Sequence, residues 1–149
     1  MSAVSPELQT VLQEARILLA DDNPISQNTT RFMLNYLGAE VDIAEHGRAA
    51  LELVSQKPYD LILMDCQMPV MNGYEATRAI REHEERATEQ SPTSQWTRTP
   101  RVPIVALSGR VMEGDREECL DHGMDDCLGK PFDLANLRSC LERWLSASE

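Results

Sequence analysis

The run Leu61-Ile62-Leu63-Met64-Asp65 lies near the middle of this chain of 149 residues. Four consecutive apolar residues suit a strand that is buried on both faces, as strands are in a parallel sheet with helices on either side. The aspartate ends the run, and ligand sites of open parallel sheets form outside the carboxyl ends of the strands. The run therefore predicts an α/β sheet with a polar site at one edge.

Four other short apolar runs are also predicted to be strands, namely Ile17–Ala20, Val41–Ala44, Ile104–Leu107 and the weaker Asp126–Leu128. Amphipathic segments alternate with them and predict helices over residues 24–37, 47–56, 73–83, 111–122 and 134–145. This alternation is typical of successive βα units, so we expect a parallel sheet.

The first and last predicted helices carry clear end signals. Asn23 suits an N-cap with Pro24 in the first turn, Gly38 suits the end of that helix, and Asp133 can cap the last one. The spacing of apolar residues predicts the buried faces. These are Ile25, Thr29, Phe32, Met33, Tyr36 and Leu37 in the first helix, and Leu134, Leu137, Leu141, Trp144 and Leu145 in the last.

The length suits a single domain, which we expect over residues 16–146. Residues 1–15 are predicted to be a tail or linker, although Val4, Leu8, Val11 and Leu12 could form one face of a short helix. Residues 84–101 are rich in Thr, Ser, Pro and charge, and they are predicted to be an irregular loop.

The composition excludes several classes of function. Fourteen basic and 25 acidic residues give a net charge of −11, which repels nucleic acids and anionic lipids. No run approaches the ~20 apolar residues of a membrane span and no signal peptide is visible, so we expect a cytoplasmic protein. The four cysteines lack the paired spacing of zinc or redox sites, and we expect reduced packing residues at Cys66, Cys119, Cys127 and Cys140.

Polar residues follow four of the predicted strands. Asp21 and Asp22 follow the first, Asp65 the third, Ser108 the fourth and Lys130 the fifth. Each pair of carboxylates at ~4 Å would repel by about 4 kcal/mol at an effective dielectric near 20, so a cation must offset this. Carboxylate oxygens suit a hard divalent ion, most simply Mg²⁺ and alternatively Mn²⁺.

Asp65 could then attack a phosphoryl group as a carboxylate nucleophile, with Lys130 and Ser108 contacting the transferred group. Each residue also has an ordinary structural explanation. Asp21 and Asp22 could cap the first helix, Ser108 could begin a loop, and Lys130 could be a turn residue before Pro131. The combination of all five favours the phosphoryl-transfer site.

The segments Met64-Asp65-Cys66-Gln67-Met68-Pro69-Val70-Met71-Asn72-Gly73 and Lys130-Pro131-Phe132, taken with the acidic pair and Ser108, resemble the receiver domain of two-component response regulators. The resemblance covers about Arg16 to Leu145 and is greatest to receivers of hybrid sensor histidine kinases. It implies a flavodoxin-like (βα)5 three-layer sandwich with the parallel strands in the order 2-1-3-4-5.

The same resemblance implies phosphohistidine donors, either a histidine kinase or a histidine phosphotransfer protein. It also implies that the backbone carbonyl of Gln67 joins Asp21, Asp22 and Asp65 as a metal ligand, and that the Lys130–Pro131 bond is cis. Whether the domain stands alone or belongs to a hybrid kinase stays open, and so does its description as an enzyme.

Three positions are expected to distinguish this chain from many members of the family. Cys127 stands where many receivers have a switch aromatic, while Gln67 and Arg110 occupy the two positions that influence the lifetime of the acyl phosphate. Arginine is always protonated and cannot act as a general base. We therefore hypothesise that Arg110 contacts the phosphoryl group or shields it from water, which would slow its hydrolysis.

Two other functions remain open at this point. A metal-dependent phosphatase of the haloacid dehalogenase class also uses an aspartate nucleophile, but it needs a second acid where Gln67 stands. A binding module that works without phosphorylation is compatible with Cys127. Steady turnover of a phosphate ester would identify the first of these functions, and a lack of response to phosphodonors would identify the second.

Overall fold

The structure, a computed structural model, describes residues 15–57, 59–66, 72–90, 102–108, 117, 119–129 and 132–146; for residues 86–90, 108 and 146 it describes the backbone alone. The five strands are all parallel and lie in the order β2-β1-β3-β4-β5, as predicted. Each is one residue longer than its prediction. Their bounds are β1 Arg16–Ala20, β2 Glu40–Ala44, β3 Leu61–Asp65, β4 Ile104–Ser108 and β5 Asp126–Gly129.

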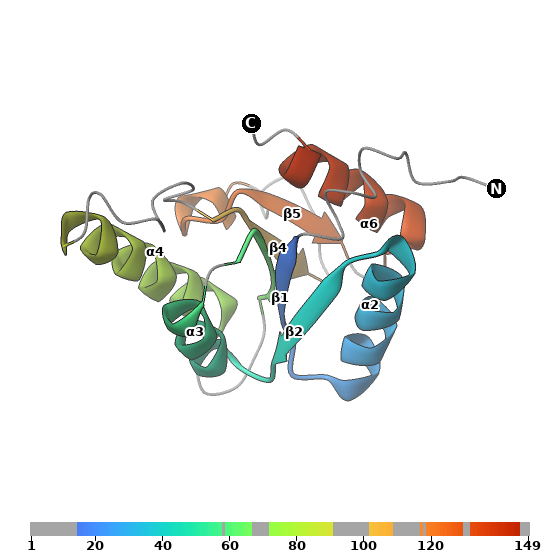
Figure 1. Cartoon of the computed structure of the whole chain (residues 1–149), viewed down its shortest axis with the longest axis horizontal. Coiled ribbons are helices and arrows are strands. Elements are labelled where there is room, and N and C mark those ends of the chain that lie inside the picture. Colours follow the sequence, from blue (N-terminus) through green and yellow to red (C-terminus); the bar gives the residue numbers. More distant parts are fainter. Residues whose placement is uncertain are drawn as a thin grey trace.

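Helices cover both faces of the sheet and give three layers (Figure 1). Helices α2 (Pro24–Leu37) and α6 (Leu134–Leu141) lie on one face, and α3 (Gly47–Gln56) and α4 (Gly73–Gln90) lie on the other. A π-helical segment, η2 (Glu142–Ser146), continues α6. Of the helix expected over 111–122, the described residues 117 and 119–121 are helical.

The ends of α2 form as the sequence predicts. The Asn23 side chain accepts hydrogen bonds from the backbone N–H groups of Ile25 and Ser26, at 2.8 and 3.2 Å. Gly38 ends the helix at φ 105°, a left-handed conformation that glycine adopts without steric cost. The acidic pair therefore leaves the N-cap role to Asn23.

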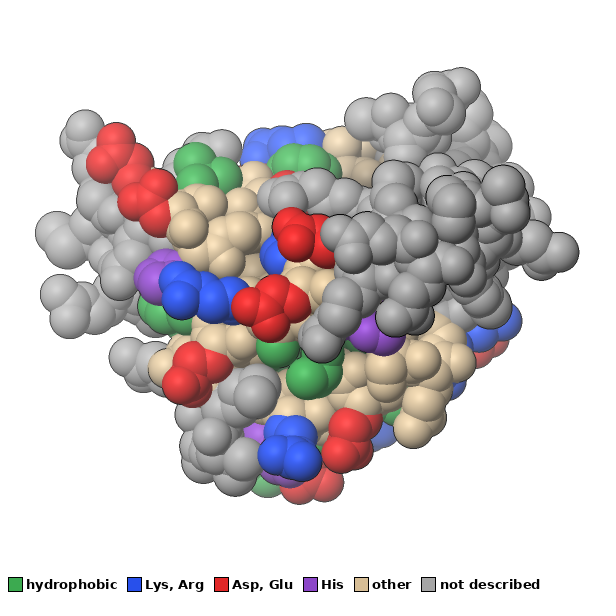
Figure 2. All heavy atoms as spheres, turned by 90° about the vertical axis from the view of Figure 1, so that its left-hand side faces the viewer, with side chains coloured by type: hydrophobic (Ala, Val, Ile, Leu, Met, Phe, Trp, Pro, Cys, Tyr) green, Lys and Arg blue, Asp and Glu red, His purple; other side chains and the backbone are tan. Residues whose placement is uncertain are grey.

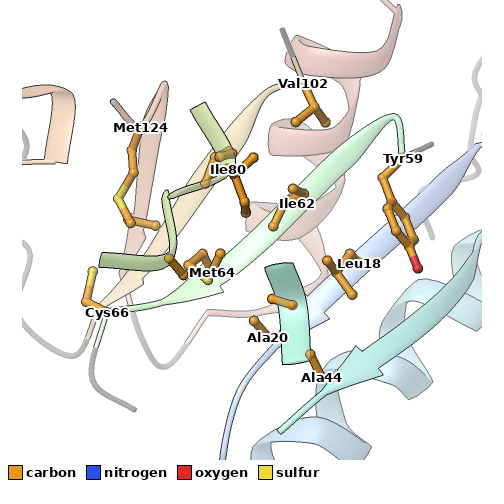
Figure 3. Packing of buried hydrophobic residues seen from close by; sticks show 14 of the residues in the cluster. Leu18, Ala20, Ala44, Tyr59, Ile62, Met64, Cys66, Ile80, Val102 and Met124 are labelled. Atoms are coloured by element: carbon orange, nitrogen blue, oxygen red, sulfur yellow. The ribbon is translucent and has the colours of Figure 1, made fainter. Parts of the chain in front are cut away.

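Strand β3 is buried along its whole length and contributes to two hydrophobic cores. Leu61 and Leu63 pack into the core under α2 and α6, while Ile62 and Met64 pack into the core under α3 and α4. Figure 3 shows Ile62 and Met64 beside Ile80 of α4. Each fully buried aliphatic side chain stabilises the fold by about 2 kcal/mol, which explains the unbroken apolar run.

The buried face predicted for α2 was mostly wrong. Ile25, Phe32 and Tyr36 are 77%, 72% and 62% exposed, and Thr29 is exposed as well. Of the predicted set, Leu37 is buried and Met33 is partly buried against the core, as predicted. The other buried residues of α2, Thr30 and Leu34, were not in the prediction. Both sets have helical spacing, and the way the helix packs on the sheet leaves the two aromatic rings outside.

The irregular loop predicted from residue 84 was wrong for residues 84–90, because α4 continues to Gln90. Side-chain contacts, two of them with residues distant in sequence, stabilise this extension of the helix. Arg81 donates to the Glu84 carboxylate at 2.9 Å and to the Asp125 carboxylate at 2.7 Å. Glu84 in turn accepts from the backbone N–H of Val102 at 2.8 Å. Residues 91–101 lie outside the described part of the chain.

The cap and the buried face of the last helix also follow their predictions. Asp133 caps α6 in a reciprocal capping box with Asn136. Leu137, Leu141 and Leu145 are buried, and Leu134 and Trp144 are partly buried against the same core. The four cysteines are free, as expected. No helix in the described ranges has the length and apolar character that a membrane span requires.

Candidate functional site

Three carboxylates meet at the carboxyl edge of the sheet. Asp21 and Asp22 directly follow β1, and Asp65 is the last residue of the neighbouring strand β3. One carboxylate oxygen from each lies within 4.8 Å of the other two. Asp21 and Asp65 are 0% and 8% exposed, whereas Asp22 is exposed. The cluster therefore has a buried wall and a side that is open to solvent.

Backbone hydrogen bonds fix Asp21 at the end of its strand. Its N–H donates to the carbonyl oxygen of Ala44 at 3.0 Å, and its own carbonyl accepts from the Gln27 side chain at 2.6 Å. One carboxylate oxygen accepts from the backbone N–H of Asn23 at 3.0 Å. These contacts hold the buried carboxylate in one position beside Asp65.

The backbone that carries Asp65 is packed closely against the start of α4. The backbone N–H of Cys66 donates to the carbonyl oxygen of Leu107 at 3.1 Å, and the backbone N–H of Gly73 donates to the carbonyl oxygen of Cys66 at 3.2 Å. A Cβ at Gly73 would lie 2.9 Å from the Cys66 Cα and would clash with the carbonyl oxygen of Asp65. Only glycine fits here, so Gly73 lets α4 begin directly beside the carboxylate cluster.

Asn72 and Glu75 hold the first turn of α4. The Asn72 side chain accepts from the Glu75 N–H at 2.9 Å, and the Glu75 carboxylate accepts from the Asn72 N–H at 3.0 Å. This reciprocal cap satisfies two backbone donors at the helix start. It fixes the turn that packs on the Asp65 backbone.

The other predicted site residues are described less fully. Ser108 ends β4, and its backbone pairs with Gly129 of β5, after which Lys130 follows in the chain. Since all strands are parallel, this places the backbone of Ser108 at the same edge as Asp65. Gln67, Arg110, Lys130 and Pro131 lie outside the described residues, so their roles and the cis bond stay predictions.

Cys127 is half-buried on β5 and packs against the core under α3 and α4, as Tyr74 does. Tyr74 stacks on His122 with ring centroids 4.3 Å apart, and its hydroxyl lies 4.0 Å from the Cys119 sulfur. Burial raises the pKa of the nearby Cys66 thiol to about 12. The thiols described here thus act as packing groups. No spacing in the sequence signals the Tyr74–His122 stack.

A second feature that the sequence did not reveal is the buried carboxylate of Asp126, beside Cys127. It accepts from the Trp144 indole N–H at 3.0 Å, from Arg143 at 2.6 Å and from the backbone N–H of Cys127 at 2.8 Å. Burial opposes ionisation, but these hydrogen bonds and the Arg143 charge hold the pKa of Asp126 below its usual value. The contacts join β5 to η2.

The donor set of the carboxylate cluster fits a hard divalent cation. Three carboxylates offer charged oxygen atoms, which Mg²⁺ and Mn²⁺ prefer over nitrogen or sulfur ligands. Without a cation their mutual repulsion would destabilise the edge of the sheet. The exposed position of Asp22 leaves an approach from solvent for a further ligand.

Comparison with known proteins identifies the family. The family model of the response regulator receiver domain matches residues 17–142. The chain belongs to the response regulator receiver family. Histidine kinase 5 of Arabidopsis thaliana is 36% identical over 143 residues, which cover 87% of this chain and 16% of that protein. Several of the most similar curated relatives are named hybrid histidine kinases, which agrees with the predicted resemblance.

Solved receiver structures are similar over almost their whole length. The receiver domain of a sensor histidine kinase from Pseudomonas aeruginosa is 41% identical, with a TM-score of 0.73 over 89% of this chain and 98% of that one. That structure has a magnesium ion coordinated in its active site cleft. The Saccharomyces cerevisiae Ssk1 receiver, solved in complex with the histidine phosphotransfer protein Ypd1, is 29% identical with a TM-score of 0.81, covering 91% of each chain.

This receiver chain spans between 6% and 16% of the length of the curated relatives it matches. The similarity therefore concerns one domain of each of those proteins. It includes the sheet edge at which Asp21, Asp22 and Asp65 meet.

Proposed function

We propose that Asp65 accepts a phosphoryl group from a phosphohistidine and later loses it to water or to a second histidine. The observation that supports this most is the convergence of Asp21, Asp22 and Asp65 within 4.8 Å at the edge of the sheet. A carboxylate oxygen of Asp65 forms the new P–O bond while the P–N bond of the donor breaks. The electron pair of the P–N bond returns to the imidazole nitrogen.

The residues that would hold a divalent cation are Asp21, Asp22 and Asp65, together with the backbone carbonyl of Gln67. Bound there, Mg²⁺ or Mn²⁺ would neutralise the carboxylates and bind oxygen atoms of the phosphoryl group. The protein supplies the fixed positions. Asp21 is held by its backbone and side-chain hydrogen bonds, and Asp65 is held by the packing of Gly73.

The negative charge on the transferred phosphoryl group also has to be stabilised by hydrogen-bond donors of the protein itself. Lys130 follows β5, and Ser108 ends β4 at the same edge, so both suit contact with phosphoryl oxygens. In this proposal Arg110 slows hydrolysis of the acyl phosphate. Cys127 is too small to act as the aromatic switch, so the response to phosphorylation depends on other groups.

Residues 16–146 form the receiver in this proposal, and residues 1–15 are a tail or linker. The donor is a histidine kinase or a histidine phosphotransfer protein. The phosphoryl transfer takes place in the cytoplasm, where ATP is available to histidine kinases. The occurrence of Ssk1 with Ypd1 in one crystal supports this class of partner. Relatives among hybrid kinases support a place in a phosphorelay.

The test is phosphorylation by a small donor. The chain is incubated with phosphoramidate and Mg²⁺, and intact mass spectrometry detects a single added phosphoryl group. We expect this addition in the parent chain and its loss in Asp65→Asn or after chelation of the metal. Absence of any addition to the parent would contradict the proposal, and so would steady turnover of a phosphate ester.

A further inference from the structure

Asp22 differs from the other two carboxylates of the cluster in its surroundings. Its side chain is exposed, whereas Asp21 and Asp65 are buried. Packing therefore fixes the side chains of Asp21 and Asp65 but not that of Asp22. Three clustered carboxylates repel one another, and this repulsion drives the exposed member away from the other two. The place of Asp22 in the cluster thus depends on the backbone that carries it.

Gln27, in the first part of α2, holds that backbone with its side chain. Its amide nitrogen donates to the carbonyl oxygen of Asp21 at 2.6 Å. Side chains of a helix lean towards its N-terminus, which lets Gln27 reach back past the start of α2. The carbonyl belongs to the peptide unit that joins Asp21 to Asp22, and a peptide unit is planar. Fixing its oxygen therefore fixes the direction in which the chain enters Asp22.

Other hydrogen bonds fix the chain on both sides of this peptide unit. The backbone N–H of Asp21 donates to the carbonyl oxygen of Ala44 at 3.0 Å, and that of Asn23 donates to the Asp21 carboxylate at 3.0 Å. The backbone N–H of Gln27 donates to the carbonyl oxygen of Asn23 at 2.9 Å, so Gln27 contacts this turn at two points. The tilt of the peptide between Asp21 and Asp22 is then set by the side chain of Gln27.

A glutamine suits this position because its amide donates a hydrogen bond without carrying charge. A glutamate would offer only acceptors to the Asp21 carbonyl, and a lysine would place a positive charge beside a site for a cation. Gln27 is half-buried, which strengthens its hydrogen bond relative to one in water. The turn is therefore held before a cation arrives, and less reorganisation is needed when one binds.

We propose that Gln27 is a positioning residue that sets the affinity of the carboxylate cluster for its divalent cation. It acts through the peptide unit between Asp21 and Asp22 and is not itself a ligand. This inference rests on the proposed function, in which the cation assists phosphorylation of Asp65. Replacing a residue that orients a metal ligand typically weakens metal binding about tenfold or more.

The first experiment titrates Mg²⁺ into the parent chain, Gln27→Leu and Gln27→Ala. Leucine keeps the bulk of the side chain and alanine is the best helix former, so both variants should fold, which circular dichroism checks. We expect the dissociation constant for Mg²⁺ to rise about tenfold in both. Asn28→Leu is the matched control, because it removes a neighbouring exposed amide that bonds only to Arg31 of the same helix among the described residues. It should leave the constant unchanged.

Mg²⁺ also associates with exposed carboxylates outside the cluster. The protein has a net charge of −11, and Figure 2 shows acidic and basic side chains spread over the face where α3 and α4 lie. The titration therefore follows the backbone amide signals of Asp22 and Cys66 in NMR spectra, since both adjoin the cluster. The amide signal of Glu52, an exposed residue of α3, reports association elsewhere.

The second experiment measures phosphorylation by phosphoramidate over a range of Mg²⁺ concentrations. We expect the half-saturating Mg²⁺ concentration to rise about tenfold in Gln27→Leu, while the rate at saturating Mg²⁺ stays within about twofold of the parent rate. A general loss of structure would instead lower the rate at every Mg²⁺ concentration. This difference between the Mg²⁺ requirement and the saturated rate identifies a positioning role.

An unchanged dissociation constant for Mg²⁺ in the two Gln27 variants would overturn the inference, and so would an equal rise in Asn28→Leu. A lower rate at saturating Mg²⁺ with an unchanged Mg²⁺ requirement would overturn it as well. Failure of phosphoramidate to modify the parent chain at any Mg²⁺ concentration would overturn the proposed function. The NMR titration would still decide the role of Gln27, because binding of Mg²⁺ does not require phosphorylation.

Discussion

The indole N–H of Trp144 donates to the buried carboxylate of Asp126 at 3.0 Å and so ties the C-terminal π-helical segment to β5. Arg143 contacts the same oxygen atom at 2.6 Å. Asp126 directly precedes Cys127 and lies on the strand that leads to Lys130. The last turn of the domain is thus coupled to the strand that carries Cys127 and directly precedes Lys130 in the sequence.

Asp126→Ala should lower the free energy of unfolding by about 2 kcal/mol at pH 7, because the partly buried Trp144 donor and the backbone N–H of Cys127 lose their partner. The pKa of Asp126 is lower in the folded protein than in the unfolded chain. Its contribution is therefore present above the unfolded value and is lost as the pH falls through the folded value. Urea unfolding from pH 7 down to pH 3 should show the difference between parent and variant shrinking below about pH 4. A constant difference would contradict this account.

Gly73→Ala should both destabilise the domain and impair phosphorylation of Asp65. The added methyl group would clash with the backbone of Asp65 and Cys66, so the start of α4 or the end of β3 must shift. We expect a loss of about 2 kcal/mol in stability and a clearly slower reaction with phosphoramidate, measured by intact mass.

Gly38→Ala provides the matched control for that substitution. Gly38 also resists replacement, because its φ is 105°, but nothing lies within 4 Å of an added Cβ. The expected cost is about 1 kcal/mol from the backbone conformation alone. Phosphorylation should be unaffected, since Gly38 lies at the other end of α2. Equal effects of the two substitutions on phosphorylation would argue against a specific role for Gly73.

The sheet and the position of the cluster could be predicted because both depend on local sequence. Buried apolar runs such as Leu61-Ile62-Leu63-Met64 identify the parallel strands, and a residue that directly follows such a run lies at the carboxyl edge. Asp21 and Asp65 lie far apart in the chain, but the strand order brings them together. The strand order 2-1-3-4-5 was predicted from the family resemblance, because hydrophobic periodicity does not say which strands are neighbours.

Features that depend on tertiary packing were not predictable in this way. The two stripes of α2, one with Phe32 and one with Leu34, have equal periodicity, and contact with the sheet decides between them. The extension of α4 depends on Arg81 and Glu84 meeting Asp125 and Val102. Asp126 meets Trp144 across 18 residues of sequence. None of these contacts leaves a signal in a local pattern.

Asp22→Asn should make the metal-free protein more stable and its response to Mg²⁺ weaker. Removing one charge from three clustered carboxylates relieves repulsion, by about 1 kcal/mol for an exposed pair at this distance in water. The same change removes a ligand, so the rise in Tm on adding Mg²⁺ should shrink. Thermal unfolding with and without Mg²⁺ measures both effects. Glu52→Gln, on the exposed face of α3, should change neither, and a larger Mg²⁺ response in Asp22→Asn would contradict the assigned site.

Arg110→Ala tests the proposed protection of the acyl phosphate. If the guanidinium contacts the phosphoryl group or excludes water from it, its removal should speed the loss of phosphate about tenfold or more, since one charge-assisted hydrogen bond is worth roughly 1.5–3 kcal/mol. The chain is phosphorylated with labelled donor, separated from it, and followed over time. Arg110→Lys keeps the charge without the planar fork and should lie between parent and alanine variant. An unchanged rate in Arg110→Ala would contradict the proposed role of Arg110 in protecting the acyl phosphate.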